Sequence, residues 1–140
     1  MGHKPMSFED WIQRVHSSIR KDPLWNFLAY QKALFAYDLM WEGCEYLLAD
    51  ERGKAIARQL TRSVGSISAN IEEGFGRGYG RDYACRLKIA FGEARESRGW
   101  YWKGRKLFAK EVLNHRIKLL DEIIALIAPN IGKQNQFKKK

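Results

Sequence analysis

The sequence predicts an all-α fold, an antiparallel up-down-up-down four-helix bundle with an extra short N-terminal helix. Prolines are confined to the ends of the 140-residue chain, at Pro5, Pro23 and Pro129, and the interior of an α-helix tolerates proline poorly. Hydrophobic residues recur at three- and four-residue spacing in five segments, which is the period of an amphipathic helix. The connections between the last four segments are short, so consecutive helices are expected to pack antiparallel.

The first helix is expected over residues 8–20, whose hydrophobic residues share one helical face. Ser7 suits its N-cap, because a serine side chain accepts a hydrogen bond from a first-turn N–H group. Asp22 and Pro23 are expected to end this helix and begin the next, over residues 24–48, since aspartate caps helices and proline fits the first helical position. Hydrophobic residues spread widely around this second helix, so it requires more than one neighbour.

A third helix is expected over residues 53–73, with Gly74 at its end, because glycine adopts the left-handed conformation that follows a helix without a steric penalty. The glycine-rich segment over residues 74–80 has neither a GxGxxG pattern nor the GK[ST] of a P-loop. It is interpreted as a helix connection. Phe75 and Tyr79 within it suit either base stacking or anchoring to the bundle.

The last two helices are expected over residues 81–109 and 111–127, and Pro129 is expected to end the second of them. The charged tail beyond it is expected to be disordered. The chain is therefore divided into an N-terminal extension with a short amphipathic helix, a four-helix bundle and a disordered basic tail, over residues 1–23, 24–129 and 130–140.

Positive charge is concentrated in the second half of the chain. The net charge is +9, yet residues 1–76 carry nine Lys or Arg against ten Asp or Glu, whereas residues 77–118 carry twelve against four. Such a cluster favours a polyanionic partner and binding that weakens with salt, with little sequence preference. A solvated basic surface is the alternative. The predicted nucleic-acid face comprises Arg77, Arg81, Lys88, Arg95, Arg98, Lys103, Arg105 and Lys106.

Large hydrophobic residues on the second and fourth helices exceed what a monomeric bundle normally leaves exposed. Symmetric self-association is the simplest way to cover them, and the alternative is that the N-terminal helix covers them within one chain. The predicted oligomer interface comprises Trp25, Trp41, Ile89, Trp100 and Trp102.

No catalytic constellation is recognisable, so the sequence predicts no enzyme, no catalytic residue, no cofactor and no metal site. Glu111 and His115 stand four residues apart. A di-metal bundle also needs carboxylates from its other helices, and the sequence lacks that pattern. Cys44 and Cys85 lack a CxxC or metal-ligand spacing, and neither a signal peptide nor a membrane-spanning run is present. Two free thiols in a cytoplasmic protein are therefore expected.

One segment resembles the signature of a known family. Residues 59–74 read QLTRSVGSISANIEEG, which is similar to the pattern QLRRAxxSIxxNIAEG of the four-helix bundle proteins encoded in intervening sequences of 23S ribosomal RNA genes, the S23 family. The resemblance extends over about residues 25–128. Two departures are Glu72, where alanine is common in the family, and the helix over residues 8–20, which lies outside the family core.

The resemblance implies a non-enzymatic four-helix bundle that assembles as a ring-like homopentamer. A similar basic pentamer, the accessory variability determinant of diversity-generating retroelements, binds a reverse transcriptase and nucleic acid. The leading hypothesis is a homo-oligomeric protein that binds nucleic acid, with RNA favoured, through its basic face. The alternative is a protein–protein interaction scaffold or an adaptor for a larger enzyme such as a reverse transcriptase. No membrane association is expected.

Overall fold

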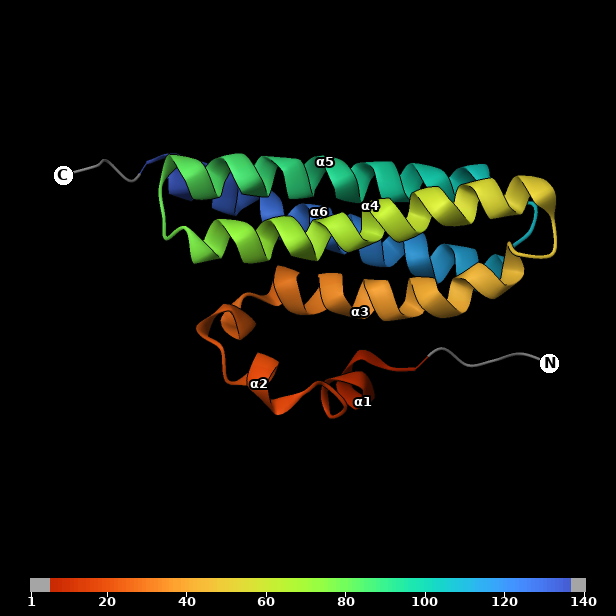
Figure 1. Ribbon diagram of the computed structural model, residues 1–140, viewed down its shortest axis with the longest axis horizontal. Helices are drawn as coiled ribbons and strands as arrows, with labels where there is room; N and C mark the ends of the chain where they lie inside the picture. The colour runs from red at the N-terminus through yellow and green to blue at the C-terminus, as the bar shows by residue number, and fades with distance from the viewer. Residues whose placement is uncertain (1–5, 137–140) are drawn as a thin grey trace.

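Four long helices lie side by side in the computed structural model, which describes residues 6–136 (Figure 1). Within that range every regular element is helical, which confirms the predicted all-α bundle. The elements are α1 (Phe8–Ile12), α2 (Ser17–Arg20), η1 (Pro23–Asn26), α3 (Leu28–Gly43), η2 (Cys44–Tyr46), α4 (Glu51–Gly76), α5 (Arg81–Lys103) and α6 (Lys110–Asn135).

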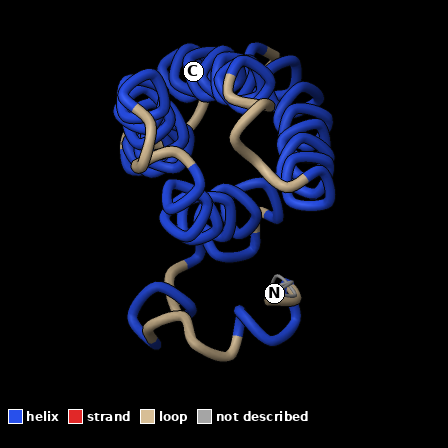
Figure 2. The backbone as a smooth tube through the Cα atoms, turned by 90° about the vertical axis from the view of Figure 1, so that its right-hand side faces the viewer, coloured by secondary structure: helices blue, strands red, loops and turns tan. Residues whose placement is uncertain are grey.

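The long helices surround a shared core in the order α3, α4, α5, α6, and each packs against its two neighbours (Figure 2). The contacts of α4 with α5 and of α5 with α6 are far more extensive than those of α3 with either neighbour. The N-terminal segment lies against α3 on the side away from the bundle (Figures 1 and 2). Three tightly packed helices are thus joined by a fourth, α3, which contacts α4 and α6 less extensively.

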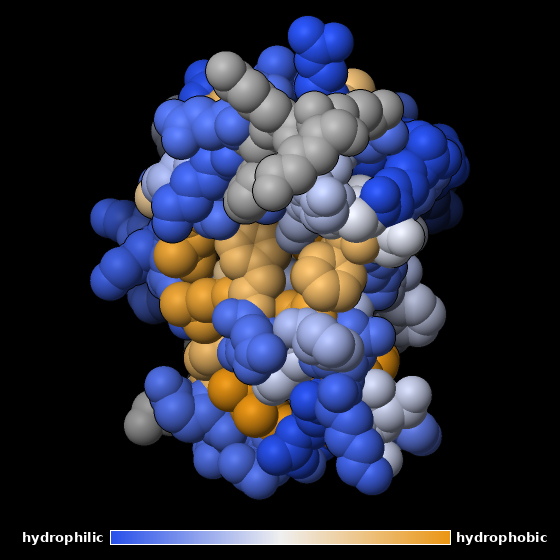
Figure 3. All heavy atoms as spheres, turned by 90° about the vertical axis from the view of Figure 1, so that its left-hand side faces the viewer, coloured by the Kyte–Doolittle hydropathy of each residue, from blue (hydrophilic) through white to orange (hydrophobic). Residues whose placement is uncertain are grey.

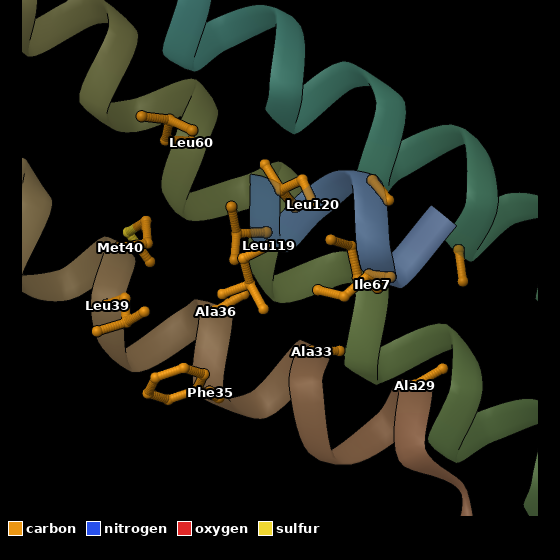
Figure 4. Packing of buried hydrophobic residues seen from close by; sticks show 14 of the residues in the cluster. Ala29, Ala33, Phe35, Ala36, Leu39, Met40, Leu60, Ile67, Leu119 and Leu120 are labelled. Carbon is orange, nitrogen blue, oxygen red and sulfur yellow. The ribbon is translucent and has the colours of Figure 1, made fainter. Parts of the chain in front are cut away.

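Small side chains line the inner face of α3. Ala29, Ala33 and Ala36 are almost completely buried, and they face larger residues of α4 and α6 such as Ile67 and Leu120 (Figure 4). Each fully buried leucine or isoleucine stabilises the fold by about 1.5–3 kcal/mol. The alanines allow the α3 backbone to approach these bulky residues closely.

The N-terminal segment forms two short helices, so the prediction of one continuous helix over residues 8–20 is wrong. The chain turns after α1, and the Nδ1 atom of His16 accepts a hydrogen bond from the N–H of Ser18 at 3.1 Å, which caps α2. Trp11 is 5% exposed and donates from Nε1 to Asp38 of α3 at 2.7 Å. The break allows the Trp11 side chain to dock against α3.

The predicted helix over residues 24–48 is interrupted at both ends. Asp22 caps as predicted, accepting from the N–H of Leu24 at 2.9 Å, but the helix that it begins is a single 3-10 turn. Phe27 then adopts an extended conformation with φ −85° and ψ 109°, so α3 begins at Leu28. After Gly43 the chain continues as η2.

Gly74 lies inside α4, so the prediction that it ends a helix over residues 53–73 is wrong. A Cβ atom at this position would lie 2.8 Å from Cβ of Arg86 and 2.9 Å from the ring of Tyr83, both on α5. Glycine is needed here because two helices approach closely. The left-handed conformation occurs beyond the helix, at Gly78 with φ +99°.

Helix α5 ends at Lys103, six residues before the predicted end at residue 109. Gly104 follows and is buried, and a Cβ atom there would lie 3.3 Å from both Leu47 and Phe108. Phe108, which falls within the predicted helix, is buried in the connection to α6 instead. Contact with the α3–α4 connection, at the same end of the bundle, therefore fixes this turn.

Helix α6 continues through Pro129 to Asn135, so the prediction that Pro129 ends it is wrong, and residues 130–135 of the predicted tail are helical. Proline removes one hydrogen bond to the carbonyl of Ala125, and both residues lie on the exposed side of the helix, where water can compensate. The last turn is held by Gln134, whose Oε1 accepts from the N–H of Gly80 at 2.9 Å. Residues 137–140 of the tail, like residues 1–5, lie outside the described residues.

Gly53 offers a test of the packing at the start of α4. A Cβ atom there would lie 2.0 Å from the carbonyl oxygen of Leu47, which is backbone and cannot move cheaply. Gly53→Ala is expected to lower the free energy of unfolding by about 1–3 kcal/mol, measured by urea denaturation. Gly92→Ala is the control, because no atom lies within 4 Å of a Cβ atom there.

The control substitution is expected to stabilise the protein by about 0.5–1 kcal/mol, since alanine favours the helix over glycine. Equal effects of the two substitutions would contradict the packing described at Gly53.

Candidate nucleic-acid interface

A row of basic residues follows the outer face of α5. Arg81, Lys88, Arg95 and Lys103 are all exposed, and at about 100° per residue they share an arc of about 80° around the helix. The row extends along about 33 Å of the helix, at about 1.5 Å per residue. The opposite face carries the buried residues, including Leu87. The helical period therefore presents these four predicted residues to solvent together.

None of these four side chains forms an ion pair with any residue between 6 and 136. Arg95 lies 6.0 Å from the ring centre of Phe91, and Lys103 lies 4.2 Å from that of Trp100. These cation–π contacts leave the positive charge uncompensated. The outer face of α5 is consequently a strip of unneutralised positive charge.

Two other predicted residues, Arg77 and Arg98, have carboxylate partners. Arg77 contacts Glu73 at 3.0 Å, and Arg98 contacts Asp121 of α6 at 2.7 Å. Solvent-exposed ion pairs of this kind contribute about 0–1 kcal/mol, so they can exchange for a phosphate. These two residues flank the row and do not belong to it.

The remaining two predicted residues, Arg105 and Lys106, extend the basic surface into the connection after α5. Both are exposed. The guanidinium of Arg105 lies 4.4 Å from the ring centre of Trp102 and donates to its carbonyl oxygen at 3.2 Å. No acidic residue occurs in the sequence between Glu96 and Glu111, so the charged residues of this connection are all basic.

Polar contacts between α4 and α5 fix the direction of the basic row. Arg62 of α4 pairs with Glu93 at 3.2 Å and also with Glu96, while the buried hydroxyls of Ser63 and Ser97 are joined at 2.8 Å. These contacts were not predicted from the sequence. The i, i+3 spacing of Glu93 and Glu96 could have indicated them, because it places both carboxylates on one side of a helix.

Glu72, which departs from the family pattern, joins α4 to α3. The hydroxyl of Tyr30 donates to its Oε2 at 2.6 Å. Burial, together with this hydrogen bond to the carboxylate, raises the pKa of Tyr30. The departure therefore has a structural role.

The five residues of the predicted oligomer interface lie in different environments. Trp25 is half-buried and stacks on Trp11 at 6.2 Å, so the N-terminal segment covers part of it. Trp100 is also half-buried, and its Nε1 donates to Glu96 at 2.8 Å. Trp41, Trp102 and Ile89 stay exposed, at 69%, 54% and 40%. The structure does not bring the five together on one surface.

A groove of about 770 Å³ lies along the open seam between α3 and α4. Trp41 and Leu48 project at its edge and are 69% and 46% exposed. Burial raises the pKa of the Cys44 thiol in this groove. The groove is lined by Met40, Trp41, Cys44, Glu45, Leu48, Lys54, Ala57, Arg58 and Thr61.

One end of the bundle, where α3 begins and α4 ends, also exposes hydrophobic surface. Figure 3 shows hydrophobic side chains at the centre of this end, within a hydrophilic rim. Leu28 and Phe75 lie at these helix ends and are 41% and 37% exposed. The ring of Phe75 meets that of Tyr83 edge-on at 6.2 Å, so this aromatic side chain of the glycine-rich segment is anchored to the bundle.

A buried arginine lies in the interior near the other end of the bundle, where α6 begins. Arg116 is 4% exposed, its Nε has no hydrogen-bond partner among the described residues, and burial lowers its pKa. An Nη1 atom of this residue lies 2.7 Å from Nδ1 of His115. Burial also raises the pKa of Tyr101, and the positive charge of the nearby Arg116 offsets part of this increase.

Among the described residues, no group of three or more His, Cys, Asp or Glu side chains is placed to hold a metal ion.

Comparison with known proteins decides the family. A sequence model for the 23S rRNA-intervening sequence protein matches residues 26–129. The chain belongs to this family. Among curated proteins, none matches the chain.

A protein of known structure shares the fold of this member of the 23S rRNA-intervening sequence family. The fold of this member is similar to a crystal structure from Bacteroides thetaiotaomicron VPI-5482, described as a protein with unknown function from the S23 ribosomal protein family. The TM-score is 0.68 at 24% sequence identity, and the match covers 74% of this chain and 97% of that chain. At this identity the likeness shows the fold alone.

Across residues 6–136, none of the helices has the length and hydrophobicity required to cross a membrane.

His115 offers a test by pH. Burial lowers its pKa from 6.5, and the positive charges of Arg116, Lys118 and Lys32 lower it further. The His115 imidazole is therefore protonated at a higher pH in the unfolded chain than in the folded protein. The contribution of neutral His115 to the free energy of unfolding is complete above pH 6.5, and it is lost as the pH falls from there through the lowered pKa.

The free energy of unfolding is expected to fall by up to about 1.4 kcal/mol per pH unit in that range. His115→Gln, which keeps an acceptor for Arg116 but does not titrate, is the matched control and is expected to flatten the curve. Identical pH profiles of the two proteins, measured by urea denaturation, would contradict the assignment.

Proposed function

We propose that this protein is a non-enzymatic, homo-oligomeric RNA-binding protein that holds RNA on the outer face of α5 with little sequence specificity. The observation that carries the proposal is the row of Arg81, Lys88, Arg95 and Lys103, whose charges have no carboxylate partner among the described residues. The family description, which refers to an intervening sequence of 23S rRNA, supports RNA over DNA.

The geometry of the row suits contacts with phosphates better than contacts with base edges. The four residues are spaced seven or eight positions apart on a straight helix, and they are accompanied by two glycines on the same outer face, Gly92 and Gly99. Arginine and lysine on such a surface neutralise phosphates and release counterions, which gives affinity without sequence information.

The proposal is tested with the triple variant Arg81→Ala, Lys88→Ala, Arg95→Ala. Its affinity for a single-stranded RNA is expected to fall, and the plot of log affinity against log salt is expected to flatten by about 2 units, since each phosphate contact contributes about 0.7. Fluorescence anisotropy at several salt concentrations measures both quantities.

The matched control removes three exposed cations from the N-terminal segment, Arg14, Arg20 and Lys21, which form no ion pair with described residues either. This control variant is expected to keep the slope of the unmodified protein. An unmodified protein that binds no RNA even at low salt, or that prefers DNA, would overturn the proposal.

The groove between α3 and α4 is the proposed contact between subunits. A tryptophan that is 69% exposed beside a hydrophobic groove is unusual for a monomer, and a second copy of the chain would cover both. Of the five residues predicted for the interface, Trp41 is the most exposed. The resemblance described above implies a ring of five.

Trp41→Glu is expected to reduce the mass in solution from that of five chains to that of one, because a carboxylate at the contact would be buried without a partner. Light scattering coupled to size-exclusion chromatography measures the mass. Gln13→Glu, which adds the same charge at an exposed position on the N-terminal segment, is the control. A monomeric unmodified protein at high concentration would exclude self-association.

The groove also favours the alternative function, a scaffold or adaptor for a larger enzyme such as a reverse transcriptase. A hydrophobic groove rimmed by Lys54 and Arg58 suits a protein segment with acidic residues. A protein that ignores RNA but binds such a partner would favour this alternative. The relation to the retroelement protein and the cytoplasmic location stay predictions.

A further inference from the structure

We infer that the connection after α5 holds an unpaired RNA base, which stacks on Trp102 while the adjacent cations contact the flanking phosphates. The inference rests on the proposed function, since it names a distinct subsite on the same basic face. It specifies single-stranded RNA as the ligand, because the bases of a duplex are stacked on each other and do not offer their faces.

Trp102 is available as a stacking platform. It is the penultimate residue of α5, and it stays 54% exposed even though Arg105 lies over its ring at 4.4 Å. An aromatic ring with a guanidinium over it still offers its remaining surface to a base, and base–aromatic stacking tolerates every base.

The turn after α5 fixes Arg105 relative to Trp102. The backbone N–H of Arg105 donates to the carbonyl oxygen of Trp102 at 3.1 Å, and its side chain donates to the same oxygen at 3.2 Å. The buried Gly104 between them packs against Leu47 and Phe108. The arginine and the tryptophan are therefore held together before any ligand arrives.

The charge around Trp102 identifies the ligand as an anion. Lys103, Arg105 and Lys106 follow it directly, and the sequence from residue 97 to residue 110 contains five basic residues and no acidic residue. A hydrophobic surface on a partner protein would meet uncompensated positive charge here. An RNA strand supplies both a flat base and the neighbouring phosphates.

Trp25 is stacked on Trp11, and the two remaining tryptophans with exposed or half-exposed rings lack this combination. Trp100 is half-buried and its Nε1 donates to Glu96, so a carboxylate occupies its vicinity. Trp41 lies between two hollows whose linings include Glu45, Asp38 and Glu42. Of Trp41, Trp100 and Trp102, only Trp102 has no described carboxylate hydrogen-bonded to its indole N–H or lining a hollow beside it. This separates it from Trp41, the residue proposed for the subunit contact.

The test compares two fluorescent RNA strands of equal length, one with bases and one abasic over its whole length. Both strands carry the same phosphates, so their difference in affinity measures the contribution of the bases, and the Trp102 variants assign the part that is due to stacking. The unmodified protein is expected to bind the strand with bases about 5- to 150-fold more tightly than the abasic strand. Trp102→Ala is expected to remove most of that preference, while Trp102→Phe retains much of it.

Salt dependence separates the two kinds of contact. Trp102→Ala is expected to leave the slope of log affinity against log salt unchanged, because no phosphate contact is lost. Lys106→Ala is the reciprocal control: it is expected to flatten the slope by about 0.7 and to keep the preference for bases.

Three results would overturn the inference while leaving the proposed function intact. These are equal affinity for the two strands, an unchanged preference in Trp102→Ala, and duplex RNA that binds as tightly as the single strand. A lower mass of Trp102→Ala in light scattering would also overturn it, by assigning the residue to the subunit contact. Absence of binding to either strand would instead contradict the proposed function itself.

Discussion

The close packing of α4 against α5 decides which side of α5 faces solvent. Gly74 allows the side chains of Arg86 and Tyr83 to approach the α4 backbone, and the hydroxyls of Ser63 and Ser97 meet in the interior. These contacts tolerate little rotation of either helix, because side chains in a protein interior interlock. The outer face of α5, with its four unpaired cations, follows from this one interface.

The ion pairs at the same seam contribute less to stability than to orientation. Arg62, which bridges Glu93 and Glu96, is about half exposed, and exposed pairs of this kind contribute about 0–1 kcal/mol each. Arg62 neutralises Glu93 and Glu96 of α5 on the side facing α4, so these two carboxylates do not offset the positive charge of the row.

Helix α3 has a different role from the other three. Its alanine-rich inner face joins the core, its outer face is covered by the N-terminal segment through Trp11, and its seam with α4 stays open. The most exposed tryptophan of the chain lies at that seam. The bundle therefore places the basic surface on α5 and the hydrophobic groove between α3 and α4, so the proposed RNA contact and the proposed subunit contact use different residues.

The sequence by itself determined the helical period, and with it the number of long helices and the exposure of the basic row on α5, while the motif over residues 59–74 indicated the family. These follow from side-chain spacing, which needs no knowledge of neighbours. It did not determine where helices end: Gly74 and Pro129 both lie inside helices, because a neighbouring helix requires glycine at the first position and the exposed side of α6 tolerates proline at the second. Nor did it determine which cations keep a free charge, since Arg98 finds a carboxylate on α6, whereas Arg95 and Lys103 find none among residues 6–136. Only the tertiary structure decided these points, because each depends on residues distant in the sequence or on the opposite side of a helix.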